Sequence, residues 1–123
     1  MSDILVTDTG FQPYASRPCL VLFASDVPET FHGRFDDKAE IHIQFDASAD
    51  GRGFSLARRL RELGYQGRLM ATGALVSDHY RHARQSGFDG VVITSEQAQK
   101  MPEAHWLEQA RRVSLSYRER IYQ

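Results

Sequence analysis

Short apolar runs alternate with helix-like stretches along this 123-residue chain, and this alternation constrains the fold more than any other feature. Strands are predicted at residues 19–24, 40–46, 69–72 and 91–93, because apolar side chains are contiguous there or alternate with polar ones. Strands that alternate with helices ordinarily form a parallel sheet with right-handed crossovers. The sequence therefore predicts a single α/β domain over residues 1–123, with about four βα units and a mainly parallel sheet.

The intervening segments carry the spacing and end signals of helices. The first predicted helix has three leucines at helical spacing and a glycine that ends it: Leu56, Leu60, Leu63 and Gly64. A second helix is expected to be capped by Ser77 and to stop at Gly87. The last helix opens at Ser95 or Pro102. Residues 4–6 are expected to add an edge strand, followed by a turn at residues 8–10.

Two architectures fit this pattern, an open flavodoxin-like sheet and half of a (βα)8 barrel. In both, a ligand would bind beyond the carboxyl ends of the parallel strands. The loops at that end begin near Ser25, Asp46, Gly73 and Thr94. Candidate ligand-binding residues are therefore expected in or just after these loops.

Composition excludes several classes of protein. The chain starts without the basic segment and apolar stretch of a secretory signal, and its longest apolar run, residues 19–24, is too short to span a bilayer. We therefore expect a cytoplasmic protein with no membrane partner. Cys19 is the only cysteine, so no internal disulfide can form, and its apolar surroundings favour a buried, inert thiol.

Charge is unevenly distributed, although the net charge is only −1. Residues 1–50 hold nine acidic and three basic side chains, whereas residues 51–123 hold seven acidic and twelve basic ones, eleven of them arginine. A nucleic-acid-binding domain is usually basic throughout, so no nucleic-acid partner is expected. The second half could instead present an arginine-rich face to an anion or an acidic protein, or simply a solvated helix surface.

The segment from Asp50 to Ser55 is the strongest candidate site. It joins a predicted strand to a helix, and Gly51 and Gly53 would let backbone N–H groups approach an anion at the helix start. Arg52 could hold such an anion with two hydrogen bonds. The competing interpretation is a glycine turn in which Ser55 caps the helix and Arg52 is solvated. The pattern matches neither a dinucleotide-binding nor a phosphate-loop fingerprint, so no cofactor is identified.

Histidines raise a second possibility. His79 and His82 lie three residues apart beside Asp78, which is a spacing that could bind a metal, but no third ligand is near them in the sequence. We therefore expect surface histidines and no metal site. No nucleophile motif surrounds Ser55 or Ser95, so catalytic residues are not assigned.

The residues from Asp50 to Glu62, which read D-G-R-G-F-S-L-A-R-R-L-R-E, resemble the signature of the bacterial domain-of-unknown-function family 934. Members often carry D-G-R-G/A-Y/F-S-x-A-R-x-L-R. Further similarities are found at Gly67, Leu69, Ala71, Gly73, Asp78, Gly87, Phe88 and Asp89, and the resemblance extends from about Leu20 to the end of the chain. It implies ligand-binding roles for Asp50, Gly51, Arg52, Gly53, Ser55 and Arg58. Gly73, where one of the loops at the carboxyl ends of the strands begins, and Asp78 are further candidate ligand-binding residues.

Members of that family are usually encoded beside sulfite reductase and sulfate-assimilation enzymes and are often labelled probable oxidoreductases. The resemblance therefore implies an accessory protein of bacterial sulfite reduction that binds a small oxyanion, a cofactor or the reductase itself. Four positions depart from the usual family pattern: Met70 and Gln85 each replace an arginine, His79 replaces a glutamine and Ser86 a cysteine. The alternative is an independent small α/β enzyme acting on a phosphorylated or carboxylated metabolite, with Asp50 and Asp78 as acid and base.

Overall fold

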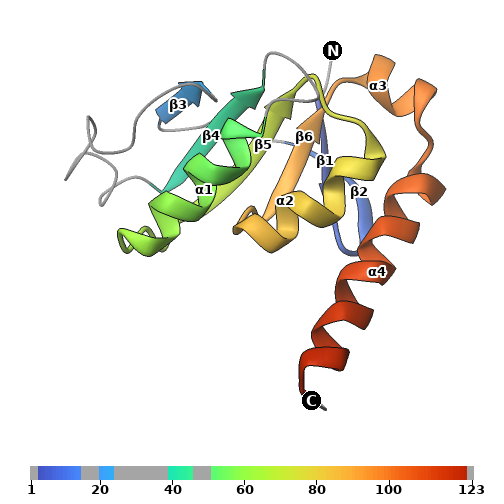
Figure 1. Ribbon diagram of the computed structural model, residues 1–123. Helices are drawn as coiled ribbons and strands as arrows, with labels where there is room; N and C mark the ends of the chain where they lie inside the picture. The colour runs from blue at the N-terminus through green and yellow to red at the C-terminus, as the bar shows by residue number, and fades with distance from the viewer. Residues whose placement is uncertain (1–2, 15–19, 24–38, 46–50, 122–123) are drawn as a thin grey trace.

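The computed structural model describes residues 3–14, 20–23, 39–45 and 51–121, and of the last nine of these only the backbone. These residues form a mixed α/β fold with one six-stranded sheet (Figure 1). The strands are β1 Ile4–Thr7, β2 Gly10–Pro13, β3 Leu20–Phe23, β4 Glu40–Phe45, β5 Arg68–Gly73 and β6 Gly90–Ile93. The helices are α1 Arg52–Glu62, α2 Tyr80–Ser86, α3 Ser95–Lys100 and α4 Glu103–Ile121, with a short 3-10 turn at Ser77–His79.

The sheet is mainly parallel, as predicted. Its strand order is β2-β1-β6-β5-β4-β3, and the four parallel strands, β3 to β6, lie side by side in sequence order. A flavodoxin-like sheet needs a reversal of strand order, and the described parallel strands contain none. The site therefore has to be sought from its residues rather than from a switch in strand order.

An antiparallel hairpin extends the sheet beyond β6. Strand β1 pairs with β2 on one side and with β6 on the other, both antiparallel. The expectation of an edge strand at residues 4–6 is therefore wrong, because the turn at residues 8–10 leads directly into β2, which takes the edge instead. The hairpin places both of its ends, at Asp3 and Tyr14, beside the carboxyl end of β6.

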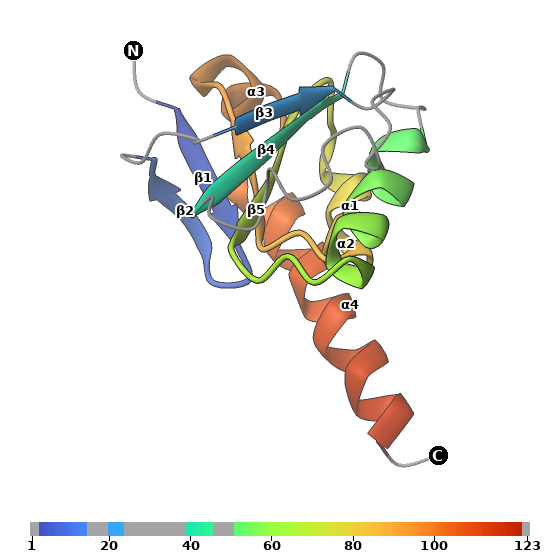
Figure 2. The same ribbon diagram turned by 90° about the vertical axis from the view of Figure 1, so that its left-hand side faces the viewer.

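Helices α1, α2 and α4 all pack on one face of the sheet (Figure 2). Alternate strand residues such as Ile41, Ile43 and Leu69 are fully buried beneath them, and α4 contributes Trp106 and Ala110 to the same core. The opposite face has its own small cluster of buried apolar residues, but no described helix covers it. Polar strand residues on that face are thus free to build a site.

Edge position explains the exposure of β3. The apolar run at 19–24 predicts a buried strand, yet Val21 and Phe23 are 45% and 47% exposed while Leu22 is buried. Because β3 ends the described sheet and only one of its faces meets helices, its side chains alternate between the core and the surface. Cys19 lies outside the described residues.

The helix ends differ from the sequence expectations in two places. Helix α1 begins at Arg52 with Gly51 before it, so Gly53 and Ser55 belong to its first turn and Ser55 is not the cap. Ser77 is not a helix cap either, because it is buried within the 3-10 turn that precedes α2. The last segment forms two helices, α3 after Thr94 and α4 after Pro102. No helix of the described residues is long and apolar enough to span a membrane.

Candidate functional site

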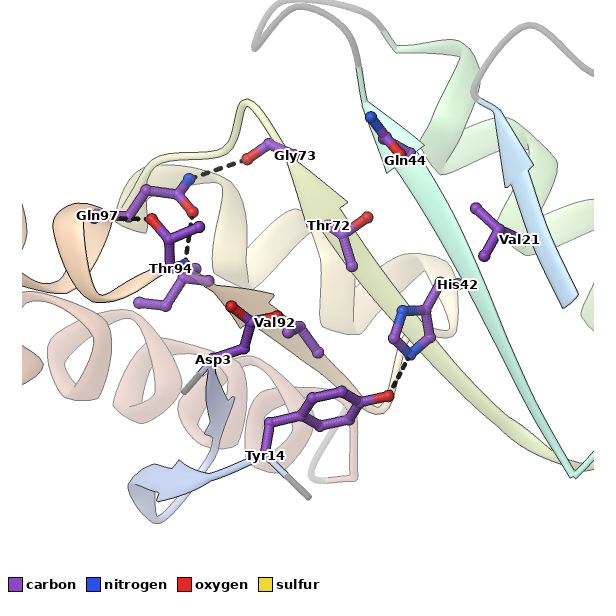
Figure 3. Close-up of a pocket in the computed structure, with 11 residues that line it drawn as sticks. Asp3, Tyr14, Val21, His42, Gln44, Thr72, Gly73, Val92, Thr94 and Gln97 are labelled. Atoms are coloured by element: carbon purple, nitrogen blue, oxygen red, sulfur yellow. Dashed lines mark hydrogen bonds between the residues drawn. The ribbon is translucent and has the colours of Figure 1, made fainter. Parts of the chain in front are cut away.

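A cavity of about 520 Å³ opens on the uncovered face of the sheet, at the carboxyl ends of β4, β5 and β6 (Figure 3). Its described lining is Asp3, Tyr14, Val21, His42, Gln44, Thr72, Gly73, Val92, Ile93, Thr94 and Gln97. The cavity thus lies at the end of the sheet where the sequence predicts a ligand.

Strand periodicity explains why polar side chains face this cavity. In β4, Ile41 and Ile43 point into the helical core, so His42 and Gln44 point to the other face. Parallel register then brings Gln44 beside Thr72 of β5, and Thr72 beside Val92 of β6. The central strands therefore present a polar row to the cavity without interrupting the core behind them.

The rim of the cavity is fixed by hydrogen bonds from α3. Gln97 donates from Nε2 to the carbonyl of Gly73 at 2.9 Å and accepts from the backbone of Thr94 at 2.9 Å. Gly73 has a φ of +99°, and a side chain there would meet the backbone of Phe45 at 2.3 Å. These contacts join the ends of β5 and β6 into one rigid edge.

Two of the lining residues, Tyr14 and His42, belong to a cluster of polar side chains that also includes Glu40 and Arg68, which do not line the cavity themselves. The Tyr14 hydroxyl donates to Glu40 Oε2 at 2.5 Å and lies 2.9 Å from His42 Nε2. His42 Nε2 is itself 2.8 Å from Glu40 Oε2, and Arg68 pairs with Glu40 Oε1 at 3.0 Å. Glu40 and His42 are buried, so the carboxylate is held by three partners away from water.

Burial raises the pKa of the Tyr14 phenol, and its hydrogen bond to Glu40 raises that pKa further. The phenol therefore keeps its proton at neutral pH and acts as a donor to Glu40. The negative charge of Glu40 is offset by Arg68, whose side chain reaches from the neighbouring strand. This cluster can orient a ligand by hydrogen bonds without adding a net charge to the cavity.

Of the described residues that the sequence predicts to bind a ligand, only Gly73 lines this cavity. Asp50 lies outside the described residues. Helix α1 starts at the carboxyl end of β4, where Gly53 packs against the ring of Phe45. None of the described residues of its first two turns lines the cavity, and the polar ones are exposed: Arg52, Ser55 and Arg58.

Asp78 lies away from the cavity. It is exposed in the 3-10 turn and lines a shallow depression with His105 and Glu108 of α4. Of the two neighbouring histidines, His79 accepts from the backbone of Val76 and His82 stacks on Phe54 at 4.1 Å. Within the described parts of the chain, no group of three potential metal ligands is present.

Several similarities that carry the resemblance have structural roles. Arg61 of α1 donates to the carbonyls of Tyr65, Gly67 and Gly87 and pairs with Asp89 at 3.0 Å. Asp89 also accepts from the backbone of Leu69, at the start of β5. This part of the motif thus ties α1 to the amino ends of β5 and β6, at the end of the sheet opposite the cavity.

Tyr14, Glu40 and His42 are not among the ligand-binding residues that the sequence predicts. One signal was present: polar residues occupy every second position of the predicted strand at 40–46, which indicates a face that no helix buries. Tyr14 had no such signal, because its place depends on the hairpin and on the pairing of β1 with β6.

These observations define a small α/β protein with a polar cavity on the face of its mainly parallel sheet that no described helix covers. The chain belongs to the family described as "bacterial protein of unknown function (DUF934)", whose model matches residues 19–123. A search of the curated proteins and of the solved structures finds no match. The match to the family includes β3 to β6 and all four helices, while the hairpin of β1 and β2 lies before it.

Proposed function

We propose that this protein is an accessory protein of bacterial sulfite reduction that holds a small polar ligand in the cavity on the uncovered face of its sheet. The observation that carries the ligand-binding role is the cavity itself, with its volume of about 520 Å³ and its row of polar side chains. Binding cavities of this size, with a few convergent polar groups, are typical of small-molecule sites. The setting in sulfite reduction comes from the family resemblance alone.

The chemistry of the lining favours a cofactor-like ligand over an oxyanion. Among the described lining residues the one formal charge is the carboxylate of Asp3, and no lysine or arginine is present. Phosphate, sulfite and carboxylate groups are ordinarily held by such cations or by helix starts. The same argument gives less support to the alternative, an enzyme acting on a phosphorylated or carboxylated metabolite.

An oxyanion would instead use the start of α1. Gly51, Arg52 and Gly53 lie there, and Ser55 of the same turn and Arg58 of the next turn are exposed. The arginine-rich second half of the chain supplies the other element of the proposal, a docking face for sulfite reductase or another sulfate-assimilation protein. Both are separate from the cavity and can be tested independently of it.

The cavity is tested by filling it. In Thr72→Phe a phenyl ring would replace a half-buried side chain at the centre of the lining, on the face that no described helix covers. Wild-type protein purified from a sulfite-reducing bacterium should release a small molecule on denaturation, detected by mass spectrometry. Thr72→Phe should release at least about tenfold less, because a ring in the cavity excludes the ligand.

Gln66→Phe is the matched control, since Gln66 is exposed in the loop before β5, at the opposite end of the sheet. It should release as much ligand as the wild type. Equal release from Thr72→Phe and Gln66→Phe would contradict the cavity as the site. The role in sulfite reduction is tested by deleting the gene: the strain should grow poorly with sulfate as the sulfur source and normally with cysteine. Normal growth on sulfate would contradict that role.

A further inference from the structure

We propose that His42 is the residue through which the cavity recognises its ligand, and that Glu40 fixes its ring so that Nδ1 is a hydrogen-bond acceptor. This inference rests on the proposed ligand-binding function and adds the chemical class of the ligand. The ligand would be an uncharged molecule with an N–H or O–H donor directed at His42. Glu40 is a positioning residue, because it acts on the ligand through His42.

The protons of the cluster can be assigned from two distances. Glu40 Oε2 lies 2.5 Å from the Tyr14 hydroxyl and 2.8 Å from His42 Nε2. A carboxylate has lone pairs but no proton, so both neighbours have to donate to it. If Nε2 were unprotonated, its lone pair would face that of the carboxylate at 2.8 Å without a proton between them. A neutral imidazole ring at this position would therefore carry its proton on Nε2.

The other ring nitrogen then becomes the acceptor that the cavity offers. Figure 3 shows the ring of His42 between Tyr14 and Thr72, with the nitrogen that does not face Tyr14 on the side of Thr72. His42 is largely buried, with only 6% of the residue's surface exposed, but it still lines the cavity. In a neutral ring with a proton on Nε2, Nδ1 carries a lone pair. A ligand in the cavity would thus meet an acceptor.

The rest of the lining points to the same class of ligand. The carboxylate of Asp3 also accepts hydrogen bonds, and the charge of Glu40 is paired with Arg68. An anion would approach a carboxylate and a ring lone pair with no described cation among the lining residues. A neutral ligand with N–H or O–H donors satisfies both acceptors. Thr72 and Gln44 can supply further hydrogen bonds from the strands beside His42.

The tautomer can be measured directly by NMR. Long-range ¹H–¹⁵N correlation of the full ¹⁵N-labelled chain, with His42 assigned by the loss of its signals in His42→Gln, should show an unprotonated Nδ1 at neutral pH. In Glu40→Gln the ring should lose this preference and give a mixture of the two tautomers. The control is Asp8→Asn, because Asp8 likewise accepts from a tyrosine and an arginine, at Tyr80 and Arg84. That variant should leave the His42 tautomer unchanged.

The donor requirement is tested with two probes of the same shape, 2-pyridone, which has an N–H, and N-methyl-2-pyridone, which lacks it. 2-Pyridone should shift the Nδ1 signal of His42, and the methylated probe should bind about tenfold more weakly, because it leaves the acceptor unpaired. Glu40→Gln should lose about the same factor for 2-pyridone, whereas Asp8→Asn should lose none.

Two results would overturn the inference. One is a proton on Nδ1 in the wild type; the other is binding of 2-pyridone that is absent or equal to that of its methylated analogue. Either result would leave the cavity proposal standing if Thr72→Phe still removes the natural ligand. The opposite combination is also possible. If His42 shows the expected tautomer but Thr72→Phe releases as much natural ligand as the wild type, the cavity proposal is contradicted instead.

Discussion

Two tyrosine hydroxyls in this protein donate to carboxylates that also hold an arginine. Tyr14 and Arg68 contact Glu40, and Tyr80 and Arg84 contact Asp8. In both cases the acid comes from the first half of the chain and the arginine from the second half. Part of the charge asymmetry of the sequence is therefore used inside the fold, to join segments that are far apart in the chain.

The Asp8 cluster predicts a pH-dependent stability. Burial alone would raise the pKa of Asp8, but hydrogen bonds from Arg84 and Tyr80 outweigh it and lower that pKa. An acid with a lowered folded-state pKa stabilises the protein above its unfolded pKa, about 4, and loses this effect as the pH falls through the folded value. Asp8→Asn should therefore be less stable at pH 7, by about 1 kcal/mol, because the 41%-exposed side chain is screened by solvent.

Urea unfolding at several pH values measures this effect. The difference between wild type and Asp8→Asn should be constant from pH 7 to about pH 5 and shrink at lower pH. A difference that grows as the pH falls would show that the Asp8 carboxylate does not stabilise the fold.

A substitution of Arg52 can distinguish between two interpretations of the start of α1, an anion-binding site and a solvated helix start. Its side chain is exposed on the first residue of α1, so Arg52→Ala should change the free energy of unfolding by less than about 1 kcal/mol. If Arg52 holds an oxyanion, the affinity for sulfite should fall more than about tenfold, because a charge-assisted contact is lost. Calorimetric titration with sulfite, together with thermal unfolding, measures both quantities. Unchanged sulfite affinity, or a large fall in melting temperature, would contradict the anion site.

At the scale of the elements, the two glycines at the start of α1 have different physical roles. A Cβ on Gly53 would lie 2.2 Å from the ring of Phe45, which is 1% exposed and has no room to move. A Cβ on Gly51 would have no described atom within 4 Å, and its φ of −71° suits any residue. Gly53 is thus required by the packing of α1 on β4, whether or not a ligand binds nearby.

Alanine substitutions test this difference. Gly53→Ala should destabilise the protein by about 1–3 kcal/mol, as overpacking of a core does. Gly51→Ala should be neutral or stabilise it by about 0.5 kcal/mol, because alanine restricts the unfolded chain. Chemical unfolding of the two variants measures both values. Equal stabilities would show that the contact with Phe45 does not constrain this position.

The sequence predicted these elements well wherever local pattern determines them. Leucine spacing located α1, and Gly64 and Gly87, with φ values of +102° and +111°, end the helices as expected. Ser77 failed as a predicted cap because the chain makes a 3-10 turn first, with the Ser77 N–H directed to the sulfur of Met101. That contact is 24 residues away in the chain, and local pattern does not contain it.

The candidate site was harder to predict because it depends on pairing between distant strands. Gly73 was expected in it, and the end of the sheet was predicted correctly for the cavity. In the sequence, Glu40 and His42 are only the polar positions of a predicted strand, since their burial by a neighbouring strand and by Tyr14 depends on pairing between distant segments. The glycine-rich motif instead predicts a site at the start of α1, where Gly53 packs against the ring of Phe45.

At the scale of the whole molecule, two sets of arginines on the helices α1 and α2 differ in burial. Arg61 and Arg84 are partly buried and hold the fold together, whereas Arg58, Arg59 and Arg81 are exposed on the helical side. We predict that the exposed group docks to an acidic protein of the sulfite-reducing system. Binding to the reductase should weaken clearly as salt rises from low to physiological levels, where charges are screened beyond about 8 Å.

Surface plasmon resonance at several salt concentrations measures this dependence. Arg58→Glu should weaken binding and reduce its salt dependence, since the variant reverses one contributing charge. Gln66→Phe, which leaves the charge unchanged, should bind as the wild type does. Absence of binding to the reductase components at low salt would contradict the docking face.

The hairpin gives the cavity a composite origin. Asp3 and Tyr14 line it from residues before the family match, whereas His42, Thr72 and Gln97 come from within it. The part of the fold that defines the family therefore supplies the strands and one wall, and the hairpin supplies the wall that holds Tyr14 against Glu40. Ligand preference in this protein is expected to depend on both.

The pairing of β1 with β6 also imposes an order in time. Ile4 lies opposite Ile93, so the hairpin leaves the ribosome long before its partner strand has been made. Contacts between distant segments are slow to form because a long loop must close first. The parallel strands and their helices can assemble before the hairpin pairs with β6. The cavity, which joins Tyr14 to Thr72, Val92 and Gln97, is then completed only after synthesis has passed α3.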